Sequence, residues 1–255
     1  MNNENTLAIV VSYNGGNKTI ETLKRLEELG LSILIVDNGS SLESLELIRR
    51  CTLANIQILE LQENMGIGFA LNKGVKLAIA NRYKWIMTMD QDTLVRPDIL
   101  NHYHRYLTRN PNVTSMVPTV ICSLPVAISR HEYEVEYAIT SGHVLNLDLF
   151  KTVGFYNEKL FIDGVDFDFC LRLRMANQKT ICIPSAIIEH ELGVPHSKNS
   201  WLGKFYSIHS PTRRYYIYRN YFFLMKNYFF KFPKFIFKAT LSHIFMFAAI
   251  VIYEG

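Results

Sequence analysis

The first half of the chain alternates short apolar runs with amphipathic segments. Each apolar run is rich in β-branched residues and predicts a strand, and the segment after it carries apolar residues at helical spacing. The predicted strands are residues 7–13, 32–36, 56–61, 85–92 and 113–120. Runs that are apolar on both faces and alternate with helices imply a parallel sheet covered on both sides. We therefore expect a Rossmann-like half, which binds ligands at the carboxyl ends of its strands.

The pattern changes after Cys122. Residues 123–137 are weakly patterned, and we expect them to loop over the site. Shorter strands and helices then follow in the order of a mixed sheet that contains antiparallel strands. They are strands at 142–147, 179–183 and 186–188 and helices at 149–153 and 165–177. From Pro211 onward the pattern predicts aromatic-rich helix, interrupted at Pro233.

Polar residues gather where the predicted strands of the first half end. They are Ser12, Tyr13, Asn14, Asp37, Asn38, Asn64, Asp90 and Asp92. The fourth strand reads WIMTMDQD, and strand alternation places Asp90 and Asp92 on one side and Gln91 on the other. Two carboxylates after an apolar run suit a divalent cation such as Mg²⁺, whose remaining ligands are substrate phosphates. The alternative is a solvated turn with a helix cap before Pro97, which is predicted to start a helix that ends near residue 108.

Residues 161–172, FIDGVDFDFCLR, hold three carboxylates between aromatic residues. Asp163 and Asp166 have the spacing of an N-cap and its third residue, so part of this cluster could simply start a helix. Asp168 has Arg172 four residues later, which predicts an ion pair within the helix. We interpret Asp166 as a general base, with helix capping as the alternative.

Two single residues near strand ends have competing interpretations. Asp37 could bind a ribose, or it could cap the next helix together with Ser40 and Ser41. His190 follows an apolar strand and could complete a cation site, although a lone histidine is more often structural.

Two further motifs also have competing interpretations. Residues 64–68, NMGIG, follow the third strand and lack the third glycine of a dinucleotide fingerprint, so a tight turn before a helix is the simpler interpretation. Arg213 and Arg214 suit a diphosphate or a basic surface that faces a membrane.

Composition narrows the class of protein. With 49% hydrophobic and 20% charged residues, the chain is typical of a globular protein, and a net charge of +4 does not indicate a nucleic-acid partner. The four cysteines lie far apart without a CxxC pair, so we expect small core residues in a reducing compartment rather than a disulfide framework or zinc site. The N-terminus lacks the pattern of a secretory signal.

Residues 221–253 interleave aromatic residues with four lysines, Lys226, Lys231, Lys234 and Lys238. The uncharged run 239–253 would span about 22 Å as a helix, short of the roughly 30 Å hydrocarbon core of a membrane. We therefore expect an interfacial helix on an anionic membrane surface rather than a spanning one, with a dimerisation surface as the alternative. Because the chain stops at Gly255 directly after this run, we also expect it to be truncated.

Seven motifs in order make the chain similar to the family 2 glycosyltransferases, which have the GT-A fold, and most closely to their bacterial rhamnosyltransferase branch. They are IVVSYN, IVDNGSS, ENMGIGFALNKG, MTMDQDT, TSGHVLNLDLFKTVGFYNEKLFIDGVDFDFCLRLR, IIEHELG and RRYYIYRN, within residues 8–220. The resemblance implies a GT-A domain over 1–210, with a nucleotide-binding half over 1–122 and an acceptor half over 123–210. A helical, membrane-associating segment would follow over 211–255.

The resemblance also implies roles for single residues. Ser12, Tyr13, Asn14 and Asp37 would hold the nucleoside of a sugar nucleotide, and Asn64 and Gly66 would shape the adjoining wall. Asp90 and Asp92 stand in the DxD motif, with Asp92 the principal contact of Mg²⁺ or Mn²⁺ and Asp90 a further metal contact nearer the ribose. Gln91, between them, would contact the sugar nucleotide. Asp166 matches the catalytic base of the ED-type motif, but Val165 precedes it where many relatives have Glu, which leaves Asp163 open as an alternative. His190 would be a further metal or diphosphate contact, and Arg213 and Arg214 would hold the diphosphate.

The implied activity is a metal-dependent, inverting transfer of a sugar. The donor would be TDP-rhamnose, and the acceptor a lipid-linked saccharide for a cell-surface polysaccharide, with the enzyme peripheral on the cytoplasmic face of the cell membrane. UDP-hexose and UDP-galactofuranose remain alternative donors. A sugar-phosphate nucleotidyltransferase is a competing interpretation, but residues 12–18, SYNGGNK, match its Gly-rich basic loop poorly. A non-catalytic sugar-nucleotide binder is another, and a homo-oligomer is possible.

Overall fold

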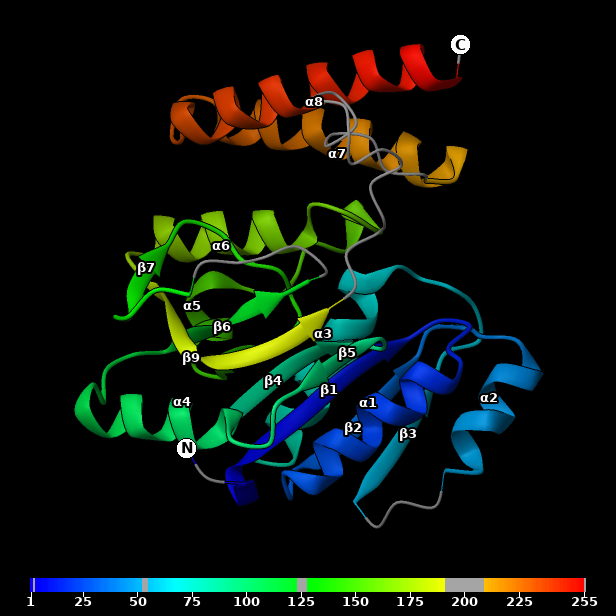
Figure 1. The fold of residues 1–255 in the computed structure, drawn as a ribbon, viewed down its shortest axis with the longest axis vertical. Coiled ribbons are helices and arrows are strands. Elements are labelled where there is room, and N and C mark those ends of the chain that lie inside the picture. The colour runs from blue at the N-terminus through cyan, green and yellow to red at the C-terminus, as the bar shows by residue number, and fades with distance from the viewer. Residues whose placement is uncertain (2, 52–54, 123–127, 191–208, 255) are drawn as a thin grey trace. The chain divides into compact units, whose positions relative to one another are not determined.

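The computed structural model describes residues 1, 3–51, 55–122, 128–190 and 209–254. Within these residues, nine strands form one mixed sheet of order β3-β2-β1-β4-β8-β6-β9-β5, and β7 pairs with β9 (Figure 1). The strands are β1 (Thr6–Ser12), β2 (Ser32–Asp37), β3 (Ile56–Glu60), β4 (Trp85–Asp90), β5 (Thr93–Val95), β6 (Ser115–Ile121), β7 (Tyr133–Val135), β8 (His143–Asn146) and β9 (Thr180–His190). The helices are α1 (Asn17–Glu28), α2 (Leu42–Arg49), α3 (Ile67–Ala80), α4 (Ile99–Arg109), α5 (Leu149–Val153), α6 (Val165–Met175), α7 (Pro211–Tyr228) and α8 (Pro233–Glu254), with 3₁₀ turns η1 (Asn3–Asn5) and η2 (Glu158–Leu160).

Strands β1 to β4 form the parallel part of the sheet, as the apolar runs predict. β1 pairs in parallel with β2 and β4, and β2 pairs in parallel with β3. β1 and β2 are buried along almost their whole length, because helices cover both faces. On one face, residues of α1, α2 and α4, among them Leu23, Ile48 and Tyr103, join the strands in one apolar cluster. On the other face of the sheet, α3 approaches β1 so closely that a Cβ at Gly74 would lie 2.6 Å from Ile9 Cγ2.

The rest of the sheet is mixed, as predicted for the second half. β8 runs antiparallel to both β4 and β6, whereas β6 and β9 are parallel. The register of β6 and β9 shifts between Pro118 and Thr119, so β9 changes direction along its length. Its first residues pair with β7 and its last with β5. This bend brings His190, at the end of β9, to the edge where β4 ends.

Several predicted boundaries were wrong. Residues 179–183 and 186–188 belong to the single strand β9, and β5 was not predicted. β7 lies in the region that we expected to be a loop, of which residues 123–127 lie outside the described residues. The helix expected to start at Pro97 starts at Ile99. The two missed strands, β5 and β7, have three residues each and pair with β9, which is distant in sequence, so local pattern carries little information about them.

The described residues group into two compact units. The first comprises Met1–Phe161 and Val165–His190, and the second comprises Ile162–Gly164 with the described residues after 208. In the second unit, α7 and α8 pack on each other: Tyr221 Oη lies 2.7 Å from Thr240 Oγ1, and the Tyr221 ring stacks on His243 at 4.3 Å. The break between the helices falls at Pro233, as predicted.

Helix α8 is longer than the uncharged run 239–253, from which we predicted a helix too short to span a membrane. It has 22 residues and starts at Pro233, so at about 1.5 Å per residue it extends about 33 Å. In the described part of the chain it is the one helix that is long and apolar enough to cross a membrane, and 17% of that apolar stretch is buried. Its length therefore no longer argues against a spanning helix.

Candidate active site

The carboxyl ends of β1, β2 and β4 meet at one edge of the sheet. In the parallel register, Ser12 is opposite Asp37, and Val11 is opposite Asp90. The predicted gathering of polar residues at the strand ends is confirmed for these three strands. Parallel strands end at the same edge, which is where such sheets bind their ligands.

Asp37 is a buried carboxylate, and one of its two oxygens has no hydrogen-bond partner among the described residues. The residue is 1% exposed, and its Oδ2 accepts a hydrogen bond from the Ser40 N–H at 3.0 Å. Its Oδ1 is buried and has no hydrogen-bond partner among the described residues. A buried polar atom left in this state costs about 1–3 kcal/mol, which a ligand donor would recover. The two interpretations of Asp37, ribose binding and helix capping, are therefore compatible. Oδ2 holds the turn before α2, and Oδ1 has no protein donor among the described residues.

Gln91 points away from the two aspartates and holds the loop after β1. Its Oε1 accepts hydrogen bonds from Ser12 Oγ at 3.1 Å and from the Tyr13 N–H at 2.8 Å, and its Nε2 donates to the Tyr13 carbonyl at 3.2 Å. Thr22 Oγ1 donates to the Gln91 carbonyl at 3.1 Å. Gln91 thus fixes the loop after β1, on the side of the strand to which the predicted alternation assigned it.

Asn14 links this loop to the turn before α2. Its backbone N–H donates to Ser40 Oγ at 2.8 Å, and its Oδ1 accepts from the Ser41 N–H at 2.9 Å. Asn14 has φ of 50°, a conformation that asparagine tolerates better than most residues. With its neighbours fixed in this way, the Tyr13 side chain remains 45% exposed at the edge of the site.

The loop after β3 is ordered by two asparagines and a glycine. Asn38 Nδ2 donates to Asn64 Oδ1 at 3.0 Å, while Asn38 Oδ1 accepts from the Met65 N–H at 2.9 Å. Asn64 Oδ1 also accepts from the Gly66 N–H at 3.0 Å. Gly66 has φ of 87°, and a Cβ there would lie 2.7 Å from Phe161 Cα. The glycine therefore permits the close approach of the loop after β3 to Phe161.

A chain of polar side chains connects Asp90 to His190. Thr140 Oγ1 donates to Asp90 Oδ1 at 3.2 Å, and the Asp90 N–H donates to Ser141 Oγ at 3.1 Å. Ser141 Oγ donates to Thr93 Oγ1 at 2.8 Å, and Thr93 Oγ1 lies 2.6 Å from His190 Nδ1. Ser141 and Thr93 are fully buried, so these bonds fix the surroundings of the DxD motif.

Of the predicted metal ligands Asp90, Asp92 and His190, the structure places Asp92 and His190 next to each other. Asp92 Oδ1 lies 3.7 Å from His190 Nδ1, because β5 pairs with β9 and sets Thr93 opposite His190. The Asp92 side chain is 44% exposed and that of His190 14%. No group of three or more His, Cys, Asp or Glu residues that could hold a metal occurs among the described residues. The pair fits a Mg²⁺ or Mn²⁺ ion that takes most of its ligands from water and substrate phosphates, not one caged by protein.

Helix α6 presents Asp166 in its first turn. Asp166 Oδ1 accepts a hydrogen bond from the Phe167 N–H at 2.8 Å. The predicted ion pair within this helix is confirmed: Arg172 Nε donates to Asp168 Oδ2 at 2.8 Å, and Asp168 is 2% exposed. Asp168 is therefore structural, and Asp166 remains the candidate base of α6.

Asp163 does not act as the N-cap that its spacing suggested. It has φ of 60°, and both its carboxylate oxygens accept hydrogen bonds at 3.0 Å from Arg213, which lies in the first turn of α7. Asp163 was predicted as an alternative base and Arg213 as a diphosphate ligand. The ion pair engages both side chains. Arg214 follows Arg213 in the same turn.

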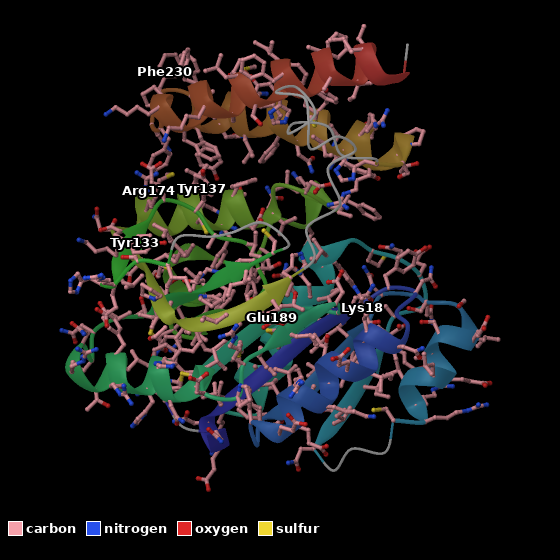
Figure 2. All side chains as sticks on the ribbon, viewed as in Figure 1. Lys18, Tyr133, Tyr137, Arg174, Glu189 and Phe230 are labelled. Carbon is pink, nitrogen blue, oxygen red and sulfur yellow. The ribbon has the colours of Figure 1, made fainter. Side chains whose placement is uncertain are left out.

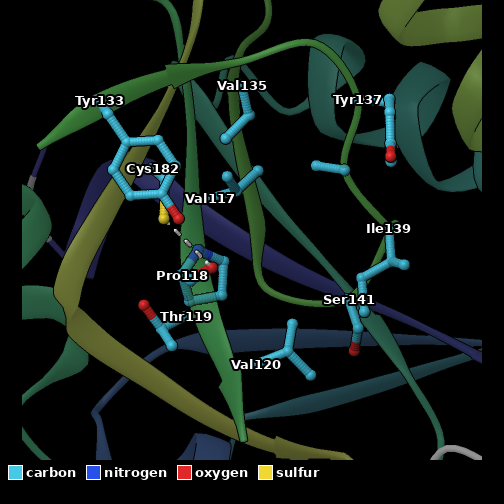
Figure 3. Close-up of a pocket in the computed structure, with 11 residues that line it drawn as sticks. Val117, Pro118, Thr119, Val120, Tyr133, Val135, Tyr137, Ile139, Ser141 and Cys182 are labelled. Atoms are coloured by element: carbon cyan, nitrogen blue, oxygen red, sulfur yellow. Dashed lines mark hydrogen bonds between the residues drawn. The ribbon is translucent and has the colours of Figure 1, made fainter. Parts of the chain in front are cut away.

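A cavity of about 300 Å³ lies beside the polar chain (Figure 3). Its wall comes from β6, β7 and the segment 137–141, and it includes Ser141. Tyr137, another wall residue, packs edge-on against Phe167 of α6 at 5.3 Å. A hydrogen bond with Cys182, together with burial, raises the pKa of Tyr133 to about 12. Apolar walls with a few polar groups are typical of ligand pockets.

A family model described as "Glycosyl transferase family 2" matches residues 7–180. That range contains the strand-end residues, the DxD motif and Asp166. The chain belongs to the family 2 glycosyltransferases. Of the resemblance motifs, residues 191–193 of IIEHELG lie outside the described residues.

Relatives of this glycosyltransferase agree with the expected branch and fold. It is 27% identical over 240 residues to the dTDP-rhamnosyl transferase RfbF of Shigella flexneri, covering 86% of this chain and 79% of that protein. Its structure is similar to S. aureus TarS 1–349 in complex with UDP-GlcNAc, with a TM-score of 0.64, 15% identity and coverage of 88% and 67% of the two chains. It is also similar to GalNAc-T7 with UDP, GalNAc and Mn²⁺, with a TM-score of 0.60, 14% identity and coverage of 73% and 44%. The expected GT-A fold and the resemblance to the rhamnosyltransferase branch are confirmed.

Sequence reasoning missed several residues that organise the glycosyltransferase site. Thr93, Thr140 and Ser141 were given no role, although a Thr-Ser-Gly run before an apolar strand was a visible signal. Asn38 was noted only as a polar residue at a strand end, whereas it joins two loops. The pairing of Asp163 with Arg213 joins residues 50 positions apart, which no local pattern reveals.

Proposed function

We propose that this glycosyltransferase moves L-rhamnose from TDP-rhamnose to a hydroxyl group of a saccharide acceptor. The observation that carries the choice of donor is the similarity to the dTDP-rhamnosyl transferase RfbF, which extends over 86% of this chain. The acceptor that we propose is a lipid-linked saccharide of a cell-surface polysaccharide.

The nucleoside binds at the ends of β1 and β2. Asp37 Oδ1 is buried without a protein donor, so an N–H of the base or a ribose hydroxyl would satisfy it. The Ser12–Asn14 loop, held by Gln91 and Ser40, forms the floor on which the base lies. Asn64 and Gly66 support the neighbouring wall through Asn38.

Asp90 and Asp92 face the sugar-phosphate end of the donor. Asp92 with His190 would hold Mg²⁺ or Mn²⁺, and Asp90, which is fixed by Thr140, lies toward the ribose. The cation, when bound, neutralises charge on the diphosphate as it leaves. Thr93 orients the His190 ring by its 2.6 Å contact with Nδ1, as outer-shell partners of metal ligands commonly do.

Transfer proceeds with inversion at the anomeric carbon. Asp166 takes the proton from the acceptor hydroxyl while that oxygen attacks C1 of rhamnose from the face opposite the diphosphate. The bond from C1 to the β-phosphate oxygen breaks, and its electron pair leaves with TDP. Arg213 is paired with Asp163, and a role of Arg214 in binding the diphosphate stays a prediction from the family resemblance.

The second unit brings the enzyme to the inner face of the cell membrane. α7 and α8 expose large apolar side chains, of which Phe230, in the turn between the helices, is 93% exposed (Figure 2). Lys226, Lys231 and Lys234 lie near this turn and suit anionic headgroups. Flotation with anionic vesicles of the whole chain and of a chain ending near residue 220 tests this role, and equal binding by both would remove it.

A UDP-linked donor is the second candidate. The observation that favours it is the similarity of fold to TarS bound to UDP-GlcNAc. A thermal-shift panel of TDP-, UDP- and GDP-sugars, each with and without Mg²⁺ or Mn²⁺, separates the donors, because a ligand of the native state raises its melting temperature. We expect the largest shift with TDP-rhamnose and a divalent cation. A larger shift with a UDP-sugar would overturn the rhamnose assignment.

A further inference from the structure

The segment from Phe161 to Gly164 leads directly into the first turn of α6 in a demanding conformation. Phe161, Asp163 and Gly164 have φ of 63°, 60° and 83°. Two of these three residues carry a Cβ, which makes such angles unfavourable. A backbone of this kind persists only where its surroundings hold it, and it occurs often at active sites.

Helix α7 supplies the groups that hold this segment. Asn220 is 2% exposed, and its Nδ2 donates to the carbonyls of Ile162 and Asp163 at 2.7 and 2.6 Å. Arg219 donates from Nε and Nη2 to Asn220 Oδ1 at 3.0 and 2.8 Å. Because the amide oxygen is taken by a guanidinium, the NH₂ group must face the two carbonyls.

Arg213, two turns earlier on α7, holds the side chain of the same segment. Its Nε and Nη2 donate to the two carboxylate oxygens of Asp163. A bidentate pair of this kind fixes orientation as well as distance. Backbone and side chain of residue 163 are thus both bound by one helix, three positions before Asp166.

We propose that Asn220 and Arg213 are positioning residues that set the start of α6 and thereby aim the Asp166 carboxylate at the acceptor hydroxyl. The helical unit would then serve catalysis as well as attachment. This inference rests on the proposed function, in which Asp166 is the base. A base misplaced by about 1 Å can lose about 100-fold in rate, so loss of these bonds should lower kcat rather than weaken donor binding.

The test compares the whole chain with Asn220→Ala and with the matched control Asn227→Ala. Asn227 lies on the same helix, but its Nδ2 donates to Phe223 within α7. The readouts are TDP released from TDP-rhamnose with a lipid-linked saccharide acceptor, the KM for the donor, and hydrogen exchange of the amides of 162–168. We expect Asn220→Ala to lower kcat on the order of 10- to 100-fold with little change in KM, and to speed exchange in this segment. Asn227→Ala should match the wild type in all three.

Asp163→Asn is the second variant, because asparagine tolerates the left-handed conformation and the fold should survive. We expect a drop in kcat of about tenfold with the pH profile of kcat unchanged in shape. A drop of about 1,000-fold or more with loss of the acidic limb would make Asp163 the base and overturn the inference.

The remaining outcomes separate the inference from the function on which it rests. If the wild type is active and Asn220→Ala keeps its kcat and its exchange pattern, the inference is wrong and the proposed function stands. If the wild type transfers no sugar from any donor of the panel, the proposed function fails, and the positioning role fails with it.

Discussion

The carboxylates proposed for the donor side of the reaction and the one proposed for the acceptor side are held in different ways. On the donor side, Asp37 and Asp90 stand at the ends of parallel strands whose register fixes where they end. On the acceptor side, Asp166 follows a short segment with positive φ angles that is bound by side chains of α7. The donor side is therefore set by the sheet, and the acceptor side by a few long-range polar contacts.

The donor side and the acceptor side should respond differently to a substitution. A sheet edge is supported by many backbone hydrogen bonds, so one substitution there alters binding without moving the frame. The Phe161–Gly164 segment depends on a small number of side chains, so one substitution can shift the residue that follows it. Donor binding should thus tolerate loss of the contacts between α7 and this segment, whereas turnover should not.

The largest effect is expected from Asp166→Asn. It removes the proposed base but keeps the shape of the side chain, so kcat should fall by about 1,000-fold or more, while the affinity for TDP-rhamnose with Mg²⁺ stays near that of the wild type. Asp168→Asn is not a suitable control, because it breaks the buried pair with Arg172. Asp148→Asn is suitable, since Asp148 pairs only at the surface with Lys151. Near-normal turnover of the Asp166→Asn enzyme would show that Asp166 is not the base.

Asp92→Asn should have the next largest effect, on donor binding. With the cation ligand weakened, the affinity for TDP-rhamnose in Mn²⁺ should fall by about 10- to 100-fold, and the difference between assays with and without metal should disappear. Titration calorimetry with and without Mn²⁺ measures both quantities. If metal still improves binding by its wild-type factor, Asp92 is not a metal ligand.

The sequence predicted where the carboxylates at the strand ends lie, and it did so for a physical reason. A parallel sheet buried on both faces has continuous apolar strands, and the residue that follows such a strand must lie at the binding edge. Asp37 and Asp90 could therefore be placed together from pattern alone. The ion pair of Asp168 with Arg172 was also predictable, because both residues lie on one helix at i and i+4.

The acceptor side was not predictable in the same way. The pairing of Asp163 with Arg213 and the contacts of Asn220 join segments more than 49 positions apart. Strand β5 and the part of β9 that pairs with it are short. Thr93 lies opposite His190 because these two strands pair, and the local sequence around either residue does not predict that pairing. Only the folded chain shows which distant residues meet.

Gly66→Ala tests the contact between the loop after β3 and Phe161. Gly66 has φ of 87°, and a Cβ would lie 2.7 Å from backbone atoms of Phe161, which also accepts a hydrogen bond from the Ile67 N–H at 2.7 Å. We expect the free energy of unfolding to fall by about 2–3 kcal/mol in denaturant titration. Gly16→Ala is the matched control, because φ there is −127° and no atom lies within 4 Å of the added carbon. Equal stability of the two variants would mean that the contact adapts at little cost.

The smallest effect is expected from His143, which lies on β8, the strand that joins β4 to β6 and so links the parallel part of the sheet to the mixed part. Burial lowers the pKa of His143 from 6.5 to about 3, and its Nε2 lies 2.8 Å from Ser115 Oγ. Below pH 6.5 the unfolded chain therefore binds a proton that the folded chain does not, so this residue makes the protein less stable as pH falls from 6.5 towards 3. The slope approaches about 1.4 kcal/mol per pH unit, or about 2 kcal/mol between pH 7 and 5. His143→Gln should be less stable at pH 7 but lose less stability on acidification, in denaturant titrations at several pH values. If the variant and the wild type show the same slope, the pKa of His143 is the same in the folded sheet as in the unfolded chain, and burial does not lower it.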